Sequence, residues 1–493
     1  MKIRFLWLSA AAALVVAATL SGCGTTNYFA GRSLPPSGLL NRVLIAIQNP
    51  SAFSSGTLQI VDAYYDRRSG YTGTPAGYSI SGYSGSLPVT IQNMPEEQVG
   101  AVYGSGDGSF VPVNYAKEST NGAVSGLNGL SSSIFMTKTQ TYVFAANQAA
   151  HVLTVVNQGN GSSYPLSLPG IYRVSVNPGG SMAVAFVENS NYAYYPVRLS
   201  AAQTTNYSGG YATWPKAAVD CEPQNAPAWC LFQMQSPDHV DATGMYYGAP
   251  LVFDRPVKAV FSGDGGTAYI LNCGPECGGN TASISSLPVA PMIFLVGQGS
   301  GTLPTNATLA STNILIPGGA SNALVDSSTM YVVGQQPQTV NVSGTPETLF
   351  AGELTVVNLS NNTTTSPVAI SDGAPGARSR ILEADNNTLW IGMTKCNNGV
   401  RAATGQAYGC LTMVNISNPS APTVTMLEPY LGDATGIAAV TGLNKIYTAE
   451  GGQVYIYSTV NGTAIDNQYV TVTGTAYDVA YMDATTDANN TVY

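Results

Sequence analysis

The sequence predicts an all-β fold, a β-propeller of about seven four-stranded blades, with six or eight blades left open. Three observations predict it: a short strand pattern recurs along the chain, turn residues separate apolar runs at regular intervals, and the recurring strand is apolar on both faces. The composition agrees. Gly (53), Tyr (29) and Pro (29) are abundant while charged residues make up 9% of the 493 residues, as expected of many short strands joined by tight turns.

The recurring strand is clearest at 153–157, 354–358 and 411–415, with looser copies at 58–62 and 454–458. In the copies that begin at Leu153 and Leu354, only one Thr interrupts an apolar run of four residues. A propeller blade packs between two neighbouring blades, so both of its faces are buried. A two-sheet sandwich would instead show regular alternation of apolar and polar residues. The pattern therefore favours the propeller.

Six complete units are predicted at 131–170, 171–256, 257–319, 320–376, 377–430 and 431–474. A seventh unit is split between the two ends of the chain. Its strands are predicted at 42–48, 57–62, 87–91 and 475–482, and their pairing would close the ring. Residues 93–130 fit the pattern poorly and are expected to form a long loop or an extra hairpin. An insertion is expected near 207–250 within the propeller domain, 41–493.

Several units resemble the seven-bladed repeats of the YVTN family, which includes lactonase-like propellers. The clearest copy runs from Ser262 through Asp264-Gly265-Gly266 to the strand Tyr269-Ile270-Leu271-Asn272. The family places Pro-Asp-Gly before a strand of this type, and Gly263 stands here where the family has Pro. A second copy, 141–147, lacks the Asp-Gly turn. The resemblance implies the fold and says little about function.

The first residues form a predicted lipoprotein signal peptide, 1–22. Lys2 and Arg4 precede an apolar run from Phe5 to Leu20, and this run is shorter than the roughly 20 residues of a spanning helix. Leu20-Ser21-Gly22-Cys23 resembles a bacterial lipobox, which implies lipidation of Cys23 and a lipid-anchored tether over 23–40. The alternative is an ordinary secretory signal. Gly24 after the cysteine, by resemblance to enterobacterial sorting, implies the outer membrane.

Six further cysteines form three pairs close in sequence, and an even number in an exported chain predicts disulfides rather than zinc ligands, because no CxxC motif occurs. The predicted pairs are Cys221 with Cys230, Cys273 with Cys277, and Cys396 with Cys410.

No catalytic, metal or cofactor site is predicted. The net charge of −9 argues against a nucleic-acid partner. Serine-hydrolase chemistry needs a base, but His151 and His239 are the only histidines and no GxSxG motif occurs. Four acidic residues lie in predicted turns, where they either cap the turn or ring one channel mouth as Ca²⁺ ligands; they are Asp107, Asp264, Asp326 and Asp385.

Two Tyr-rich clusters are candidate binding surfaces, because Tyr and Arg are enriched at interfaces; the alternative is packing between blades. The candidate residues are Tyr64, Tyr65, Arg67, Arg68, Tyr192, Tyr194 and Tyr195.

The sequence therefore predicts a binding or scaffolding propeller of the cell envelope, attached to the membrane by its lipid, with an envelope protein or a glycan as partner. The alternatives are a hydrolase or lactonase acting on a small ester, lactone or glycan in the channel, and a surface-layer component.

Overall fold

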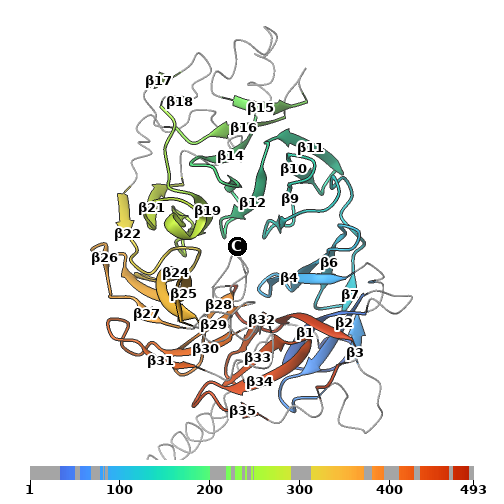
Figure 1. Cartoon of the computed structure of the whole chain (residues 1–493). Helices are drawn as coiled ribbons and strands as arrows, with labels where there is room; N and C mark the ends of the chain where they lie inside the picture. Colours follow the sequence, from blue (N-terminus) through green and yellow to red (C-terminus); the bar gives the residue numbers. More distant parts are fainter. Residues whose placement is uncertain are drawn as a thin grey trace, which may run out of the picture.

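Eight antiparallel sheets of four or five strands surround a central axis, so the described residues form an eight-bladed β-propeller (Figure 1). The structure is a computed structural model. It describes residues 34–49, 56–67, 78–80, 83, 87–199, 218–223, 228–235, 239–240, 246–247, 249–289, 312–342, 344–370, 380–393, 410–426, 433–465, 470–472 and 474–487.

Each blade is given from its innermost strand outward. Blade 1 contains β36 (Thr475–Tyr481), β1 (Arg42–Gln48), β2 (Gly56–Asp62) and β3 (Tyr78–Ile80). Blade 2 contains β4 (Pro88–Met94), β5 (Val99–Gly104), β6 (Phe110–Asn114) and β7 (Ser119–Thr120). Blade 3 contains β8 (Ser133–Met136), β9 (Tyr142–Asn147), β10 (Val152–Asn157) and β11 (Ser162–Ser167). Blade 4 contains β12 (Ile171–Val176), β13 (Ala183–Val187), β14 (Ala193–Arg198), β16 (Trp229–Gln233) and β15 (Ala218–Glu222).

Blade 5 contains β19 (Pro256–Phe261), β20 (Thr267–Asn272), β21 (Ser283–Pro288) and β22 (Thr312–Leu315). Blade 6 contains β23 (Asn322–Asp326), β24 (Thr329–Val342), β25 (Thr345–Asn358), β26 (Thr363–Thr364) and β27 (Val368–Ala369). Blade 7 contains β28 (Arg380–Ala384), β29 (Thr388–Met393), β30 (Cys410–Asn415) and β31 (Thr423–Met426). Blade 8 contains β32 (Ala434–Val440), β33 (Lys445–Glu450), β34 (Gln453–Ser458) and β35 (Ala464–Ile465). A separate hairpin pairs β17 (His239–Val240) with β18 (Tyr246–Tyr247), and η1 (Gly274–Cys277) follows β20.

The predicted count of about seven blades is wrong, because residues 88–120 form a complete blade of their own, blade 2. The expected loop or hairpin at 93–130 contains β5, β6 and β7, and the segment 87–91 assigned to the split unit belongs to β4. The third strand of this blade reads FVPVN and lacks the recurring LTVVN pattern, so the repeat is hidden there. The recurring apolar strand is the third strand of its blade at β2, β10, β25, β30 and β34, as predicted.

The split blade is confirmed. β1 pairs with β2 on one side and with β36 on the other, so the two ends of the described chain share one sheet. Fully buried Arg42 secures this closure. Its backbone N–H donates to Asp483 Oδ2 at 2.7 Å and its Nη2 donates to Asp483 Oδ1 at 2.6 Å. Its Nη1 reaches blade 2, where it donates to the Tyr115 carbonyl at 2.6 Å and to Glu118 at 2.9 Å.

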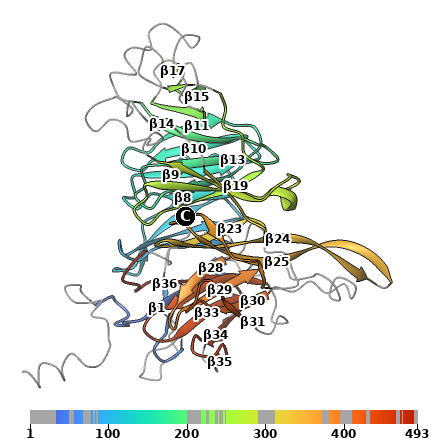
Figure 2. The same cartoon turned by 90° about the vertical axis from the view of Figure 1, so that its left-hand side faces the viewer.

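The core lies between blades rather than inside one of them. Trp229 of blade 4 packs edge-on against Phe144 of blade 3 with ring centroids 6.0 Å apart. Trp390 of blade 7 lies 6.1 Å from Tyr457 of blade 8. Such contacts bury both faces of a blade, which explains why its strands lack a polar face. One hairpin departs from the disc: β24 and β25 continue beyond blade 6 as an extended arm (Figure 2).

The Tyr457 hydroxyl donates at 3.2 Å to Glu450, a carboxyl that is 2% exposed. Burial raises the pKa of Glu450 to about 7. The folded protein therefore holds a proton that the unfolded chain releases above its ordinary pKa of 4.5, so this group lowers stability as pH rises from 4.5 to 7.

Glu450→Gln is expected to raise the free energy of unfolding at pH 8 by about 2–3 kcal/mol and to leave it unchanged at pH 4. Denaturant titrations at the two pH values measure this difference. Exposed Glu188→Gln is the matched control. Equal effects of the Glu450 variant at both pH values would contradict the assignment.

Candidate functional site: the central channel

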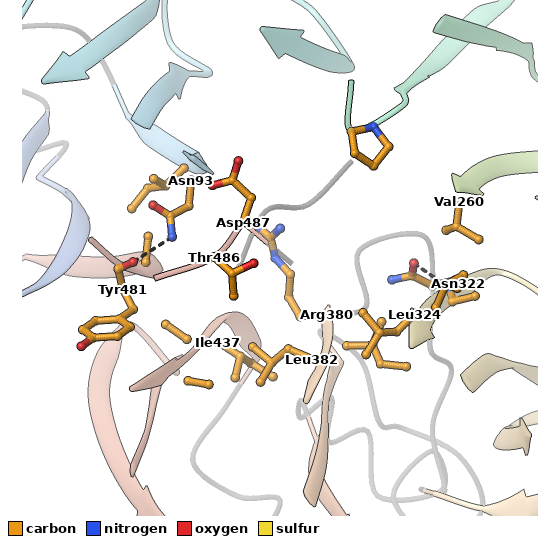
Figure 3. Close-up of a pocket in the computed structure, with 18 of the residues that line it drawn as sticks. Asn93, Val260, Asn322, Leu324, Arg380, Leu382, Ile437, Tyr481, Thr486 and Asp487 are labelled. Atoms are coloured by element: carbon orange, nitrogen blue, oxygen red, sulfur yellow. Dashed lines mark hydrogen bonds between the residues drawn. The ribbon is translucent and has the colours of Figure 1, made fainter. Parts of the chain in front are cut away.

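The central channel encloses a cavity of about 330 Å³. Residues of β4, β19, β23, β28, β32 and β36 line it, together with the turns that follow β8 and β12. Much of the wall is apolar: Figure 3 shows Val260, Leu324, Leu382 and Ile437 around the cavity, with the side chain of Arg380 reaching between them and the segment that carries Thr486 and Asp487.

Three cationic side chains lie among the first three residues of innermost strands: Arg173 on β12, Lys258 on β19 and Arg380 on β28. Innermost strands of a propeller run in one direction, so these residues belong to the same end of the channel. One carboxylate, Asp478 in the middle of β36, is paired with this group. Of these four residues, Lys258, Arg380 and Asp478 line the cavity, whereas Arg173 lies outside its lining.

β-Bulges explain how two of these side chains are aimed. The register of β12 shifts between Ile171 and Arg173, and that of β19 shifts at the equivalent position before Lys258. A bulge redirects side chains and leaves a backbone group outside the ladder. The carbonyl of Val257, the bulged residue of β19, accepts a hydrogen bond from Arg173 Nη1 at 3.2 Å. Arg173 thus links blade 4 to blade 5, and burial lowers its pKa.

Arg380 makes the corresponding contact three blades further on, between blades 7 and 8. Its Nε lies 3.5 Å from the carbonyl of Thr435, the bulged residue of β32, and its Nη2 donates to Asp478 Oδ2 at 2.8 Å. Asp478 also accepts the backbone N–H of Ile91 at 2.8 Å. Burial raises the pKa of Asp478, and Arg380 and the backbone donors oppose that rise. Gly436 follows the bulge because a Cβ there would lie 2.4 Å from Asp478 Oδ1.

Lys258 is half-buried and lines the cavity. Its Nζ donates to Asn322 Oδ1 at 2.8 Å, a neutral partner that also accepts the N–H of Ala323 at 2.9 Å. Burial, with repulsion from Arg173 and Arg380, lowers the pKa of Lys258 to about 7. This end of the channel therefore concentrates positive charge without a matching number of carboxylates, which is the chemistry of an anion-binding site.

The opposite mouth has its own charged cluster. Lys138, in the turn after β8, contacts Glu96 at 2.5 Å and Asp487 at 3.0 Å. Burial lowers the pKa of Lys138, but the hydrogen bonds to Glu96 and Asp487 outweigh it and raise the pKa overall. One lysine faces two carboxylates here, so among the described residues this mouth is an ion-pair network with a net negative charge.

The turn carboxylates predicted from sequence do not gather into a Ca²⁺ site, since the described residues contain no group of three or more His, Cys, Asp or Glu side chains placed to hold a metal. They act in turns instead. Asp264 accepts the N–H of Gly266 at 2.9 Å, and Asp385 accepts the N–H groups of Gly442 and Asn444 from the next blade at 2.8 and 2.9 Å. Asp107 similarly accepts the N–H of Ser109.

The first predicted Tyr cluster is exposed and ordered. Tyr64 and Tyr65 are 57% and 49% exposed with ring centroids 4.8 Å apart, and the Arg67 guanidinium lies 4.6 Å from the centre of the Tyr65 ring. Asp66 fixes this turn to blade 8 through Lys445 and Tyr447, each at 2.5 Å. Arg68 lies outside the described residues.

The second Tyr cluster lies on blade 4, whereas the first follows β2 of blade 1, so the two clusters do not form one surface. Tyr192 is exposed and Tyr194 is half-buried, whereas Tyr195 is buried and packs 5.8 Å from Phe232. Tyr195 therefore belongs to the blade packing, and the surface of this cluster is limited to the other two.

Two predicted disulfides are confirmed. Cys221 pairs with Cys230 across β15 and β16, and Cys273 pairs with Cys277 around η1. Cys396 and Cys23 lie outside the described residues, so the third disulfide and the lipidation site stay predictions. His151 is exposed before β10 and His239 lies on β17, so neither lines the channel cavity.

The residues of the cationic end were missed by the sequence analysis. Aligning the first strands of neighbouring units would have placed Arg173 and Lys258 at the same position of blades 4 and 5. Because the chain has only 18 Lys and Arg residues, two cations at one position of an apolar strand are a usable signal.

Comparison with known proteins yields likeness in fold only. No family model matches the sequence, and no curated protein matches it. Solved structures that resemble it include a dihydro-haem d1 dehydrogenase in complex with DHE (12% identity, 92% of this chain and 79% of that chain, TM-score 0.47). Others are the Pseudomonas aeruginosa periplasmic gluconolactonase (13%, 90% and 98%, TM-score 0.36) and the Kuenenia stuttgartiensis hydrazine synthase (13%, 81% and 100%, TM-score 0.42). At these values the likeness assigns no ligand.

Proposed function

We propose that this protein is a lipid-anchored binding protein of the cell envelope whose channel binds a small anionic molecule. The observation that carries the proposal is the excess of positive charge at one end of the cavity, where Lys258 and Arg380 line the wall beside a single carboxylate, Asp478. Charge buried in this way is costly unless an opposite charge compensates it, so a bound carboxylate or phosphate group would be stabilised there.

The shape of the site supports a small ligand. The cavity volume of about 330 Å³ lies at the lower end of the range for small-molecule pockets. Apolar walls lower the local dielectric and strengthen each charge-assisted hydrogen bond. A hydrolase or lactonase acting in the same channel stays a prediction. Such an enzyme needs a catalytic carboxylate, and the carboxylate at the cationic end, Asp478, already accepts hydrogen bonds from Arg380 and from two backbone N–H groups.

Lys258→Met is expected to weaken binding of citrate or inorganic phosphate about 10- to 100-fold at pH 6, because a hydrogen bond to a charged group contributes about 1.5–3 kcal/mol. In the wild type, affinity is expected to fall as pH rises through about 7, since the amine loses its charge there. Isothermal titration calorimetry at pH 6 and pH 8.5 measures both effects.

Exposed Lys117→Met is the matched control and should bind as the wild type does. Equal affinity in the Lys258 variant and the wild type, or affinity that is independent of pH, would contradict the proposal that the channel binds the anion.

The envelope location rests on residues 1–40. Cys23→Ser is expected to block lipid attachment and to move the protein from the membrane fraction to the soluble fraction. Membrane fractionation and mass spectrometry of the N-terminus check this. Unchanged processing and membrane association would refute the anchor. Within the described residues, no helix is long and apolar enough to cross a bilayer.

A further inference from the structure

Lys258 differs from Lys138 and Lys445 in its partners. Lys138 contacts carboxylates, and Lys445 contacts Asp66 and two backbone carbonyls. The Nζ of Lys258 instead donates to the neutral amide oxygen of Asn322 and opens onto the cavity. It is thus a primary amine at the wall of an enclosed, partly apolar space.

The groups that face this amine favour its uncharged form. From β12 comes Arg173 and from β28 comes Arg380, both cationic; from β23 comes Asn322, which is neutral; and Asp478 on β36 is engaged by Arg380. Cationic neighbours together with desolvation are the conditions that activate a lysine amine as a nucleophile. The shift of the Lys258 pKa to about 7 follows from the same surroundings.

The amide of Asn322 orients the amine. Its Oδ1 is fixed by the N–H of Ala323 at 2.9 Å and accepts one N–H of Lys258 at 2.8 Å. In the neutral amine the nitrogen lone pair is then directed away from Asn322. Arg380, which repels the ammonium and lines the same cavity, would hold an anionic group of a bound molecule beside it.

We propose that Lys258 forms an imine with small carbonyl compounds that carry an anionic group, such as 2-oxo acids. This inference rests on the anion binding proposed above. The Nζ lone pair adds to the carbonyl carbon, forming a C–N bond, while the carbonyl oxygen takes up a proton. Loss of that oxygen as water, with the protons from nitrogen and solvent, leaves the C=N bond. Hydrolysis reverses every step, and no oxidant or reductant is required.

Reductive trapping tests the proposal on the full-length protein. Pyruvate is added with sodium borohydride, which converts an imine irreversibly into a secondary amine, and peptide mass spectrometry locates the adduct. We expect one adduct per protein at Lys258, at least tenfold above every other lysine, and a trapping rate that rises with pH through about 7 and then levels off. Lys258→Arg should lose the adduct, Lys117→Arg should keep it, and acetone, a neutral carbonyl compound, should give at least tenfold less.

Calorimetry with lactate separates the two proposals, since lactate carries the carboxylate but has no carbonyl to trap. Lactate binding without a pyruvate adduct at Lys258 would overturn the imine and leave anion binding standing. Neither lactate binding nor adduct would overturn both. Adducts spread evenly over all lysines would also overturn the imine, because they would show no activation of Lys258.

Discussion

Replacing Asp483 with alanine is expected to lower the free energy of unfolding by about 3–5 kcal/mol, because the change leaves the Arg42 guanidinium buried without its main counter-charge. Both side chains of this pair are 0% exposed. Asp483 also accepts the backbone N–H of Arg42 at 2.7 Å, so the variant leaves a backbone donor of β1 unpaired. The effect acts on the whole ring, since this contact joins the first and last described strands.

Guanidinium denaturation followed by circular dichroism measures the loss. Exposed Asp326→Ala is the matched control and is expected to change stability by about 0.5 kcal/mol or less. A double-mutant cycle with Arg42→Met adds a second check: the double variant should lose clearly less stability than the two single losses summed. Strict additivity would show that the pair does not stabilise the closure.

Replacing Arg380 with leucine is expected to weaken binding of small anions by about 100-fold or more, roughly 3 kcal/mol. Two effects act in the same direction. The variant removes a cation from the channel, and it leaves the Asp478 carboxyl, whose side chain is 5% exposed, without its ion-pair partner. Any charge that Asp478 then retains repels the ligand. Calorimetric titration with citrate at pH 6 measures the change.

The conservative variant Arg380→Lys separates the effect of the positive charge on anion affinity from the effect of the guanidinium geometry. Lysine keeps the cation but cannot reach Thr435 and Asp478 with separate nitrogen atoms, so intermediate affinity is expected. Asp478→Asn should act in the opposite direction and tighten anion binding, because it removes the carboxylate and keeps the shape. Tightening in Arg380→Leu, or weakening in Asp478→Asn, would contradict the assigned signs.

Most of the fold could be predicted from the chain because a blade imposes a recognisable pattern on its third strand. The strands at β10, β25 and β30 repeat nearly the same residues, and closure by β1 and β36 followed from their positions at the two ends. Blade 2 escaped because β6 reads FVPVN and lacks the LTVVN pattern that β10 and β25 share. Tertiary packing, with β5 buried throughout, forms that blade despite its weak local pattern.

The cationic end of the channel could not be predicted in the same way. Arg173, Lys258, Arg380 and Asp478 are spread over more than half of the chain and meet only when the ring closes. The bulges that aim Arg173 and Lys258 leave no obvious mark in the residues around them. Asp264 and Asp385, which had the stronger local signal, turned out to hold turns.

The most direct test of channel binding is an anomalous difference map from crystals of the protein soaked in selenate, a tetrahedral anion whose selenium can be located unambiguously. A peak within hydrogen-bonding distance of Lys258 and Arg380, absent in crystals of Lys258→Met, is the predicted result. Selenate bound only at the outer surface, or an unchanged channel peak in the variant, would contradict the claim that these two cations form an anion site.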